Sequence, residues 1–351
     1  MAASPACHIW HGERPDGRLG FMYALIVATL RASCATSVRS VRSQSLAHAA
    51  NASALLPAAL ALRRGDLFVW VGPKQHAAPP WALLRARGVV RLYYNTEPLP
   101  YGCLVPPLRR PLRRALPSPP LVDEVLDYSL ANIETCAARA DAPPLRHLPP
   151  GWGEGWGEGG MPPPPRGAAR AAQALFLGDV RLEERAACFA GLRALVRPVN
   201  DVWNRTAFAA LFSRGVTVVV NVHKRCLQEE RTQPFEAVRA AQVLSAGGIL
   251  VSQRAHPRDE AAYAGLVDFH PLAQLPRAIE QLLATPHLSR LAASRAREFA
   301  LRFAPAASFH AAAVPRAGGA AACTRTLPHA VCCRHPDARP PVSQRIMQCR
   351  R

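Results

Sequence analysis

The sequence predicts an α/β protein with two doubly wound domains that face each other across a cleft. Strand-like and helix-like segments alternate in both halves, and a stretch rich in glycine and proline separates them. Of the 351 residues, 49% are hydrophobic, which is enough for two cores of ordinary domain size. We expect Rossmann-like domains at residues 1–148 and 173–303, a linker at 149–172, and a low-complexity, disordered tail at 304–351.

The first half alternates short apolar strands with helical segments. Residues 67–71 and 89–94 are compact runs of β-favouring residues, typical of strands buried on both faces. Further strands are expected at 6–11 and 35–41, helices at 19–31, 45–64, 80–87 and 130–140, and an ordered segment at 121–129. Residues 98–120 are rich in proline and arginine, so we expect them to wrap the surface without regular structure.

The second half repeats the alternation more cleanly. Residues 216–222 are strongly β-branched and predict a buried strand. The other strands are expected at 174–177, 196–202, 249–252 and 266–269, and the helices at 183–195, 207–212, 234–246, 275–284 and 287–303. The pattern predicts one Rossmann-like unit with two helices at its end.

An apolar run at residues 19–30 predicts a buried helix. The run is too short to span a bilayer, and it follows Glu13 and Asp16 rather than a basic segment. We therefore expect no signal peptide and no transmembrane helix, with a cytoplasmic or unassigned location. The sequons at Asn51 and Asn204 have no weight in such a chain, because they matter only in a secreted protein.

The formal net charge of +19 raises nucleic acid as a partner. Only Lys74 and Lys224 among the 43 basic residues are lysine, and the arginines are scattered along the chain. They are not interleaved with aromatic residues, as a surface for stacking bases requires. A basic nucleic-acid-binding protein is therefore the least favoured of the alternatives.

The ten cysteines are irregularly spaced and do not predict a small disulfide scaffold. The one dense group contains Cys323, Cys332, Cys333 and Cys349, near His329 and His335. A metal knuckle needs regular Cys-x-x-Cys pairs, and the sequence has none there. We expect free thiols in the tail and no metal site.

Polar and glycine residues follow the predicted strands of the second half, where ligands bind in open parallel sheets. They are Gly178, Asp179 and Arg181, then Asn221, His223, Lys224 and Arg225, then Glu236, and finally Gln253 and Arg254. A glycine after a strand lets backbone amides approach a diphosphate, and Lys224 and Arg225 supply positive charge. Glu236 could accept hydrogen bonds from ribose hydroxyls. Together these residues predict a nucleotide-diphosphate site.

Each of these residues also has a purely structural interpretation. Gly178 could be only a turn glycine. His223 and Lys224 could form a solvated strand end, and Glu236 and Arg239 could be an intrahelical ion pair worth about 0.2–0.5 kcal/mol. The convergence of several such groups at strand ends favours the ligand site.

The same rule selects three groups in the first half. They are His11 with Gly12 and Glu13, then Gly72 with Lys74, and then Asn95 with Thr96 and Glu97. A general base for a sugar hydroxyl must be a carboxylate or imidazole, so Glu97, Glu13 and His11 are the options. Glu97 precedes Pro98, which holds its backbone extended, and it is our provisional catalytic residue, with His11 and Glu13 on the acceptor side. Asp123, Glu124 and Asp127 are expected on a solvated face.

Seven motifs resemble those of group 1 and spore-coat (CgeB-like) glycosyltransferases of the GT-B superfamily. In the first half they are Tyr94-Asn-Thr-Glu-Pro98, Asp123-Glu-Val-Leu-Asp-Tyr-Ser129 with Asn132, and Leu148-Pro-Pro-Gly-Trp152. In the second half they are Leu175-Phe-Leu-Gly178, Asn221-Val-His-Lys224, Glu236-Ala-Val-Arg239 and Ala246-Gly-Gly-Ile-Leu-Val-Ser-Gln253. The resemblance covers residues 5–303.

The resemblance implies a GT-B fold with the donor bound by the second domain, the acceptor bound by the first, and usually no metal. The rule for strand ends and the resemblance together give the predicted donor site as Gly178, Arg181, His223, Lys224, Glu236, Arg239, Gly247, Gly248 and Gln253. The sequence departs from the family in two places. Retaining members have paired glutamates where this chain has Pro234 and Gln242, and related sequences often have Glu where it has Gln253.

These patterns predict a metal-independent, hexosyl-type glycosyltransferase. The sugar would pass from a nucleotide-diphosphate sugar to an unidentified glycan, protein or small molecule, with no other cofactor. The departures from the family pattern leave a second hypothesis, a catalytically inactive protein that binds a nucleotide sugar.

Overall fold

The computed structural model describes eleven segments of the chain, and every structural statement below concerns them. They are residues 7–11, 25–30, 38–42, 62–71, 81–96, 122–137, 144–153, 172–181, 183–200, 205–213 and 215–305. All of them belong to one compact unit, Met1–Val314. The predicted tail beyond residue 305 lies outside them.

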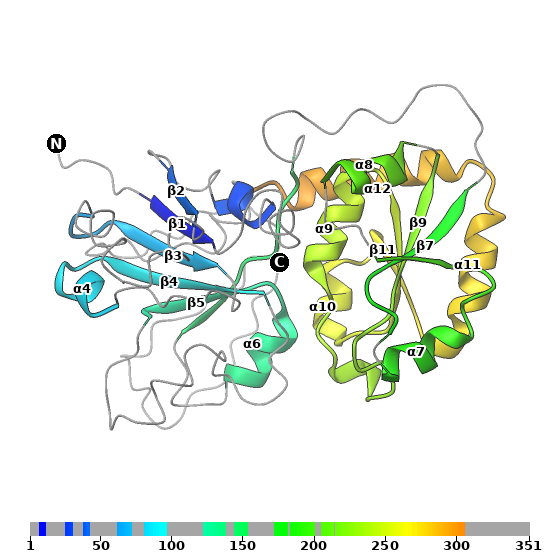
Figure 1. The fold of residues 1–351 in the computed structure, drawn as a ribbon, viewed down its shortest axis with the longest axis horizontal. Helices are drawn as coiled ribbons and strands as arrows, with labels where there is room; N and C mark the ends of the chain where they lie inside the picture. The colour runs from blue at the N-terminus through cyan, green and yellow to red at the C-terminus, as the bar shows by residue number, and fades with distance from the viewer. Residues whose placement is uncertain are drawn as a thin grey trace, which may run out of the picture. The chain divides into compact units, whose positions relative to one another are not determined.

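The first sheet has six parallel strands in the order β2-β1-β3-β4-β5-β6 (Figure 1). Its strands are β1 (Cys7–His11), β2 (Val38–Arg42), β3 (Leu67–Val71), β4 (Val90–Asn95), β5 (Glu124–Asp127) and β6 (Leu145–His147). The helices described beside them are residues 25–30, α4 (Trp81–Ala86) and α6 (Leu130–Ala137). The order of the strands is that of a doubly wound sheet.

Both faces of the first sheet are covered by apolar side chains. Phe68 and Trp70 of β3 pack in one cluster with Trp81 of α4, whereas Val69 of the same strand packs in the other with Ile26. Successive side chains of a strand point to opposite faces, so a strand covered on both sides must be apolar throughout. This explains why the run at residues 67–71 could be predicted to the residue.

The second sheet has five parallel strands in the order β11-β10-β9-β7-β8 (Figure 1). Its strands are β7 (Gln173–Leu177), β8 (Arg197–Val199), β9 (Thr217–Asn221), β10 (Ile249–Gln253) and β11 (Val267–His270). Its helices are α7 (Glu183–Ala190), α8 (Arg205–Phe212), α9 (Ala237–Ser245), α10 (Pro257–Ala262), α11 (Leu275–Leu283) and α12 (Leu288–Arg302), with 3-10 turns η2 (Glu230–Thr232) and η3 (Leu272–Gln274).

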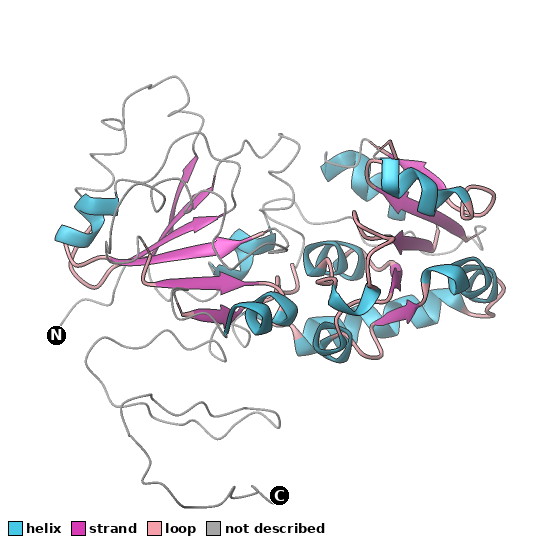
Figure 2. Ribbon diagram, turned by 90° about the horizontal axis from the view of Figure 1, so that it is seen from below, coloured by secondary structure: helices cyan, strands magenta, loops and turns pink. Residues whose placement is uncertain are grey.

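Helices cover the second sheet on both faces (Figure 2). Val218 and Val220 of β9 pack in a cluster with residues of α7 and α11, whereas Val219 packs in a cluster with residues of α8 and α9. The β-branched valines are stiff at χ1 and suit a strand with no solvent-exposed face. The two layers hold the strand ends rigidly, and the functional groups lie at these ends.

Several contacts connect the surroundings of the two sheets. Val238 of α9 packs in the cluster that contains Ile26 and Val69. The Gly151 amide donates to the Thr29 hydroxyl at 2.8 Å, and the Trp152 amide donates to the Phe303 carbonyl at 2.8 Å. The start of the predicted linker is therefore an ordered, packed turn.

Most predicted elements are present, with small shifts at their ends. The helix expected at 183–195 ends at Ala190, because Gly191 opens a run of turns. Residues 62–64 are not helical, and the rest of the helix expected at 45–64 lies outside the described segments. The sequence missed β6 and α10, which have three and six residues. None of the helices in the described segments is long and apolar enough to cross a membrane.

Candidate active site

The predicted ligand groups of the second half lie at the carboxyl edge of its sheet. Gly178 follows β7 directly, and His223 and Lys224 lie in the loop that follows β9. Glu236 is the N-cap residue of α9. The structure brings these three segments together around Arg185 of α7, a residue that the sequence analysis did not select.

The Arg185 guanidinium is buried, and the residue is only 3% exposed. Its Nη2 atom lies 3.7 Å from Oε1 of Glu236 and donates to the Val222 carbonyl at 3.1 Å. Its Nη1 atom donates to the Asp179 carbonyl at 3.4 Å. Its Nε atom is buried and has no hydrogen-bond partner among the described residues. One donor of this buried cation is therefore unsatisfied.

Arg239 of α9 supplies a second guanidinium to the same carboxylate. Its Nη2 atom lies 2.7 Å from Oε2 of Glu236, and its Nη1 atom donates to Oδ1 of Asn221 at 2.5 Å. Both guanidiniums lie over the ring of Phe176, with Cζ-to-centroid distances of 5.4 Å for Arg185 and 5.9 Å for Arg239. We call Arg185, Arg239, Glu236 and Phe176 the arginine cluster.

The positive charges around Glu236 keep its carboxylate ionised. Burial acts to raise the pKa of this carboxyl, but Arg239, Arg185, His223 and Lys224 together outweigh it, and the pKa is lowered. Burial also lowers the pKa of Arg185, although the charge of Glu236 opposes this change. The Glu236 side chain is 25% exposed, so a ligand can reach the carboxylate.

Gly178 allows the loop after β7 to pass close to the cluster. A Cβ atom at this position would lie 3.1 Å from Cε1 of Phe176 and 3.7 Å from Nη1 of Arg185. A larger residue would displace the ring beneath the two guanidiniums. Arg181 does not join the cluster, because its side chain is 80% exposed and forms two hydrogen bonds with Asp179, which lower the pKa of that carboxyl.

His223 and Gln253 hold the loop after β9. The Gln253 Oε1 atom accepts from the His223 amide at 3.2 Å, and its Nε2 atom donates to the Cys226 carbonyl at 2.8 Å and to Oε1 of Glu230 at 3.0 Å. Because Gln253 is fully buried and bonded at both polar atoms, it holds the loop in place. Its contact with the donor stays a prediction.

The His223 ring is buried. Burial lowers its pKa, opposed by its hydrogen bond to Arg254 and by Glu236 and Glu230. Its Nε2 atom lies 2.8 Å from the Arg254 carbonyl, and a carbonyl can only accept, so Nε2 holds the proton. Lys224, the next residue, is exposed at the same edge.

Gly247 and Gly248 lie at the opposite end of the sheet from the other predicted donor residues, and their contact with the donor stays a prediction. They precede β10, whereas the ligand groups follow the strands. Gly247 has φ +72° at the end of α9, and a Cβ on Gly248 would lie 2.5 Å from Cε1 of Phe212. They are needed for the turn and for close packing.

The carboxyl edge of the first sheet contains a buried acid. Asp127 is fully buried and accepts from Asn95 Nδ2 at 2.7 Å, the Ser129 amide at 2.8 Å and Asn132 Nδ2 at 2.9 Å. Burial raises its pKa to about 7, against the opposing effect of these donors, and nearby Asp259 raises it further. The expectation of a solvated face is wrong for Asp127.

Glu124 is also buried, and it pairs with Arg146. Burial raises its pKa in spite of this partner. The expected solvated face fails here too, because β5 is an inner strand with neighbours on both sides. Glu13 and Glu97 lie outside the described segments, and for His11 only the backbone of β1 is described.

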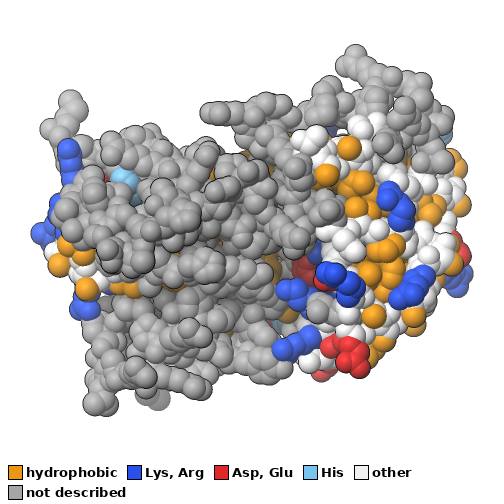
Figure 3. Space-filling model, in the orientation of Figure 1, with side chains coloured by type: hydrophobic (Ala, Val, Ile, Leu, Met, Phe, Trp, Pro, Cys, Tyr) orange, Lys and Arg blue, Asp and Glu red, His pale blue; other side chains and the backbone are white. Residues whose placement is uncertain are grey.

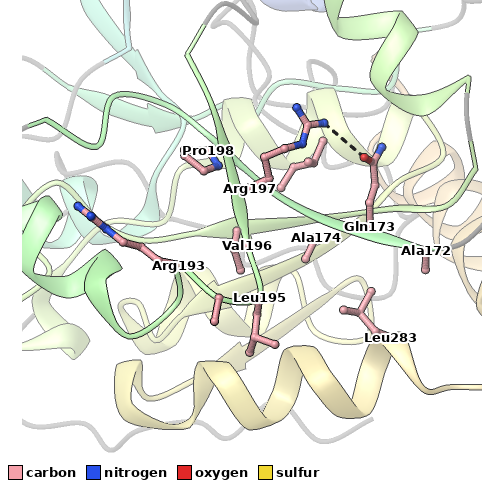
Figure 4. Close-up of a pocket in the computed structure, with 11 residues that line it drawn as sticks. Ala172, Gln173, Ala174, Arg193, Leu195, Val196, Arg197, Pro198 and Leu283 are labelled. Atoms are coloured by element: carbon pink, nitrogen blue, oxygen red, sulfur yellow. Dashed lines mark hydrogen bonds between the residues drawn. The ribbon is translucent and has the colours of Figure 1, made fainter.

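A hollow of about 420 Å³ lies at the other edge of the second sheet (Figure 4). It is lined by the start of β7, the segment that leads into β8, and Leu283 of α11. In Figure 4 Arg197 reaches Gln173 across it, with a 3.4 Å hydrogen bond. It contains none of the groups that converge at the carboxyl edge, so we do not assign the active site there.

Several basic side chains in the described segments are paired. Arg91, Arg185, Arg239, Arg254 and Arg295 each have a carboxylate partner. On the face in Figure 3, the described basic side chains stand in separate groups between apolar and other residues. The same segments contain no group of three or more His, Cys, Asp or Glu side chains placed to hold a metal ion.

No protein-family model matches the sequence, and no curated protein matches it. Among solved structures, trehalose-6-phosphate from E. coli bound with UDP-2-fluoro glucose has 11% sequence identity and a TM-score of 0.50, over 87% of this chain and 96% of that one. AviGT4, a glycosyltransferase of avilamycin A biosynthesis, has 13% identity and a TM-score of 0.46, over 87% and 96%. SnogD from Streptomyces nogalater has 15% identity and a TM-score of 0.42, over 88% and 99%.

The first of these similarities extends over nearly the whole of both chains and concerns the fold. It agrees with the two parallel sheets and their strand orders. The predicted fold class, with two Rossmann-like sheets in a GT-B glycosyltransferase-like fold, is confirmed.

Proposed function

We propose that this protein transfers a sugar from a nucleotide-diphosphate sugar to an acceptor, and that the donor binds at the carboxyl edge of the second sheet. The observation that supports this best is the arginine cluster. Two largely buried guanidiniums share one carboxylate, beside a glycine loop that follows a parallel strand. The cluster has net positive charge, which suits an anion with several oxygens.

The structure with the TM-score of 0.50 is described as bound to UDP-2-fluoro glucose. A donor of that class would place its diphosphate against the Gly178 loop, Arg185 and Arg239. Glu236, which stays ionised and partly exposed, would accept hydrogen bonds from ribose hydroxyls. Lys224 would add a further cation from the loop after β9.

Catalysis would come from positioning and from stabilising the leaving diphosphate. The bond from the anomeric carbon to the diphosphate oxygen breaks as the acceptor oxygen attacks, and negative charge grows on the leaving group. The guanidiniums are held in advance by Asn221, Val222 and Glu236, so little reorganisation is needed. On this basis we propose metal-independent hexosyl transfer, with Glu97 as the provisional base and His11 and Glu13 as the other acceptor-side groups.

Binding of UDP, ADP and GDP by calorimetry, in the presence of EDTA, tests the donor site. We expect one of them to bind, and Arg239→Met to weaken its affinity roughly tenfold to hundredfold through loss of charge-assisted hydrogen bonds. Arg193→Met is the matched control, since Arg193 is exposed on the segment that leads into β8, at the other edge of the sheet. Absence of binding, or equal effects of the two variants, would refute the donor site.

Release of nucleoside diphosphate from the matching UDP-, ADP- or GDP-sugar then tests transfer. We expect turnover by the unmodified protein and its loss in Glu236→Ala. Nucleotide binding without turnover on a panel of glycan, peptide and small-molecule acceptors would instead identify an inactive nucleotide-sugar-binding protein.

A further inference from the structure

A disulfide bond joins two of the segments that form the candidate site. Cys188 of α7 is bonded to Cys226, which lies in the loop after β9. Arg185 of the arginine cluster is one helical turn before Cys188, and Lys224 is two residues before Cys226. The bond therefore ties the helix that holds one cation to the loop that holds another.

Besides the disulfide, hydrogen bonds hold this loop, and Val222 at its start packs in the core. Gln253 holds the His223 amide and the Cys226 carbonyl, and Oε1 of Glu184 accepts from the Leu227 amide at 2.9 Å. Leu227 is 68% exposed, so the outer part of the loop has little packing of its own. The disulfide, whose two residues are buried in the core between α7 and the sheet, is the strongest link in the set.

We propose that the Cys188–Cys226 disulfide is a positioning crosslink for nucleotide binding, so that affinity for a nucleoside diphosphate depends on the redox state of this pair. The inference rests on the proposed function. In the reducing step a dithiol gives two electrons and two protons to the pair, the S–S bond breaks, two cysteine thiols form, and the dithiol becomes a disulfide.

Reduction loosens the site because the S–S bond no longer fixes the distance between the two cysteines. Their sulfur atoms move apart to non-bonded contact, and α7 and the loop become free to shift relative to each other. Shifts of roughly 1 Å in aligned groups can cost about 100-fold in catalytic rate, and a nucleotide held by several aligned hydrogen bonds is sensitive to the same shifts. Both segments also affect Glu236. Arg185 of α7 pairs with its carboxylate, and His223 and Lys224 of the loop lower its pKa.

Thermodynamic linkage gives a second, independent consequence. If reduction weakens nucleotide binding by some factor, bound nucleotide must make the disulfide harder to reduce by the same factor. A disulfide that only stabilised the fold would show no such reciprocity at temperatures where both forms are folded.

The test measures the affinity of the oxidised and the dithiothreitol-reduced protein for the tightest binder among UDP, ADP and GDP. The state of Cys188 and Cys226 is checked by thiol alkylation and mass spectrometry. We expect roughly tenfold weaker binding after reduction and recovery after reoxidation. We also expect the fraction reduced, in a graded dithiol buffer, to fall when the nucleotide is added.

Cysteine variants show whether the change in nucleotide binding comes from this disulfide or from another that dithiothreitol reduces. Cys188→Ala with Cys226→Ala should bind as weakly as the reduced protein. Cys136→Ala, which removes a disulfide-bonded cysteine of α6 beside the first sheet, should bind as tightly as the unmodified protein. Circular dichroism shows whether each form is folded, and if the double variant is not, the reversibly reduced protein decides the result.

The outcomes of the two proposals are distinguishable. If the oxidised protein binds none of the three nucleotides, the proposed function fails and this inference fails with it. If it binds one of them and reduction leaves the affinity unchanged, with both thiols shown to be free, the proposed function stands and the crosslink proposal is overturned. Recovery of Cys188 and Cys226 as free thiols from the oxidised protein would also overturn it.

Discussion

The hydroxyl of Ser129 donates a 2.6 Å hydrogen bond to the carboxylate of Asp259, a residue 130 positions further along the chain. Ser129 precedes α6 beside the first sheet, and Asp259 belongs to α10 beside the second. The same carboxylate accepts from the Leu130 amide at 2.7 Å and from the Phe235 amide at 3.0 Å. Phe235 immediately precedes Glu236, so this acid connects the start of α6 to the candidate site.

Asp259→Ala should lower the free energy of unfolding by about 3 kcal/mol, because it leaves several buried donors without an acceptor. Ser129→Ala should cost about 1 kcal/mol, since only one of those donors is removed. Urea unfolding of the two single variants and the double variant measures their coupling, which we expect to be about 1 kcal/mol. Strict additivity of the two changes would contradict a direct interaction.

The pKa of Asp127, raised to about 7, predicts a pH-dependent stability with a defined sign. The native carboxyl takes up its proton at higher pH than the unfolded one, so the stability it contributes falls as the pH rises from about 4 to about 7. The full loss is about 4 kcal/mol on the scale of one pKa unit per 1.36 kcal/mol.

Asp127→Asn should remove this dependence, because the amide stays neutral. The stability difference between variant and unmodified protein, from urea unfolding, should therefore increase in favour of the variant between pH 4 and pH 8. Glu280→Gln, at an exposed carboxyl of α11, serves as the control. If the stability difference between Asp127→Asn and the unmodified protein does not change with pH, the Asp127 carboxyl of the native protein titrates normally.

Gln253→Glu should destabilise the protein by about 3 kcal/mol at neutral pH. The new carboxylate would replace two donors, and it would face the Cys226 carbonyl and the carboxylate of Glu230 in a fully buried position. Adding Glu230→Gln should recover about half of the loss, because its amide can donate to the new carboxylate. Thermal unfolding of the three variants measures this, and a loss that is not reduced in the double variant would exclude the mechanism.

Gly247→Ala and Gly248→Ala form a matched pair that separates backbone strain from steric conflict. Gly247 has φ +72° with open space around it, so alanine there should cost about 1 kcal/mol. Alanine at Gly248 would place its Cβ 2.5 Å from Phe212 and 2.9 Å from Val243, so it should cost about 2–3 kcal/mol. The nucleoside diphosphate affinity of the folded variants tests the predicted contact of these glycines with the donor: a clear loss of affinity would support it, and an unchanged affinity would contradict it.

The second sheet was predictable because its strands are buried on both faces. Val218, Val219 and Val220 contact two different clusters, and no polar residue could take any of these places without losing its solvation. Two elements escaped prediction for the opposite reason. The strand β6 and the helix α10 are too short for their residue periodicity to stand out.

The candidate site was predictable only in part. Gly178, His223 and Lys224 follow strands directly, so the rule for carboxyl ends selected them. Arg185 lies further along, on α7 after Glu183 and Glu184, where an arginine has the sequence pattern of a solvated helix. Its burial follows from its approach to Glu236 and Phe176, which lie at distant positions in the chain.

The pairing of Cys188 with Cys226 closes a covalent ring of chain that contains β8, α8 and β9, and its ends are 38 positions apart in sequence. Such a ring removes conformational freedom from the unfolded chain, and a ring of this length corresponds to a stabilisation of roughly 4 kcal/mol in the loop-entropy model. The denatured oxidised protein therefore samples fewer conformations than the denatured reduced protein. On heating, the oxidised and reduced proteins should therefore differ most in the temperature at which the second sheet unfolds, because the ring lies there.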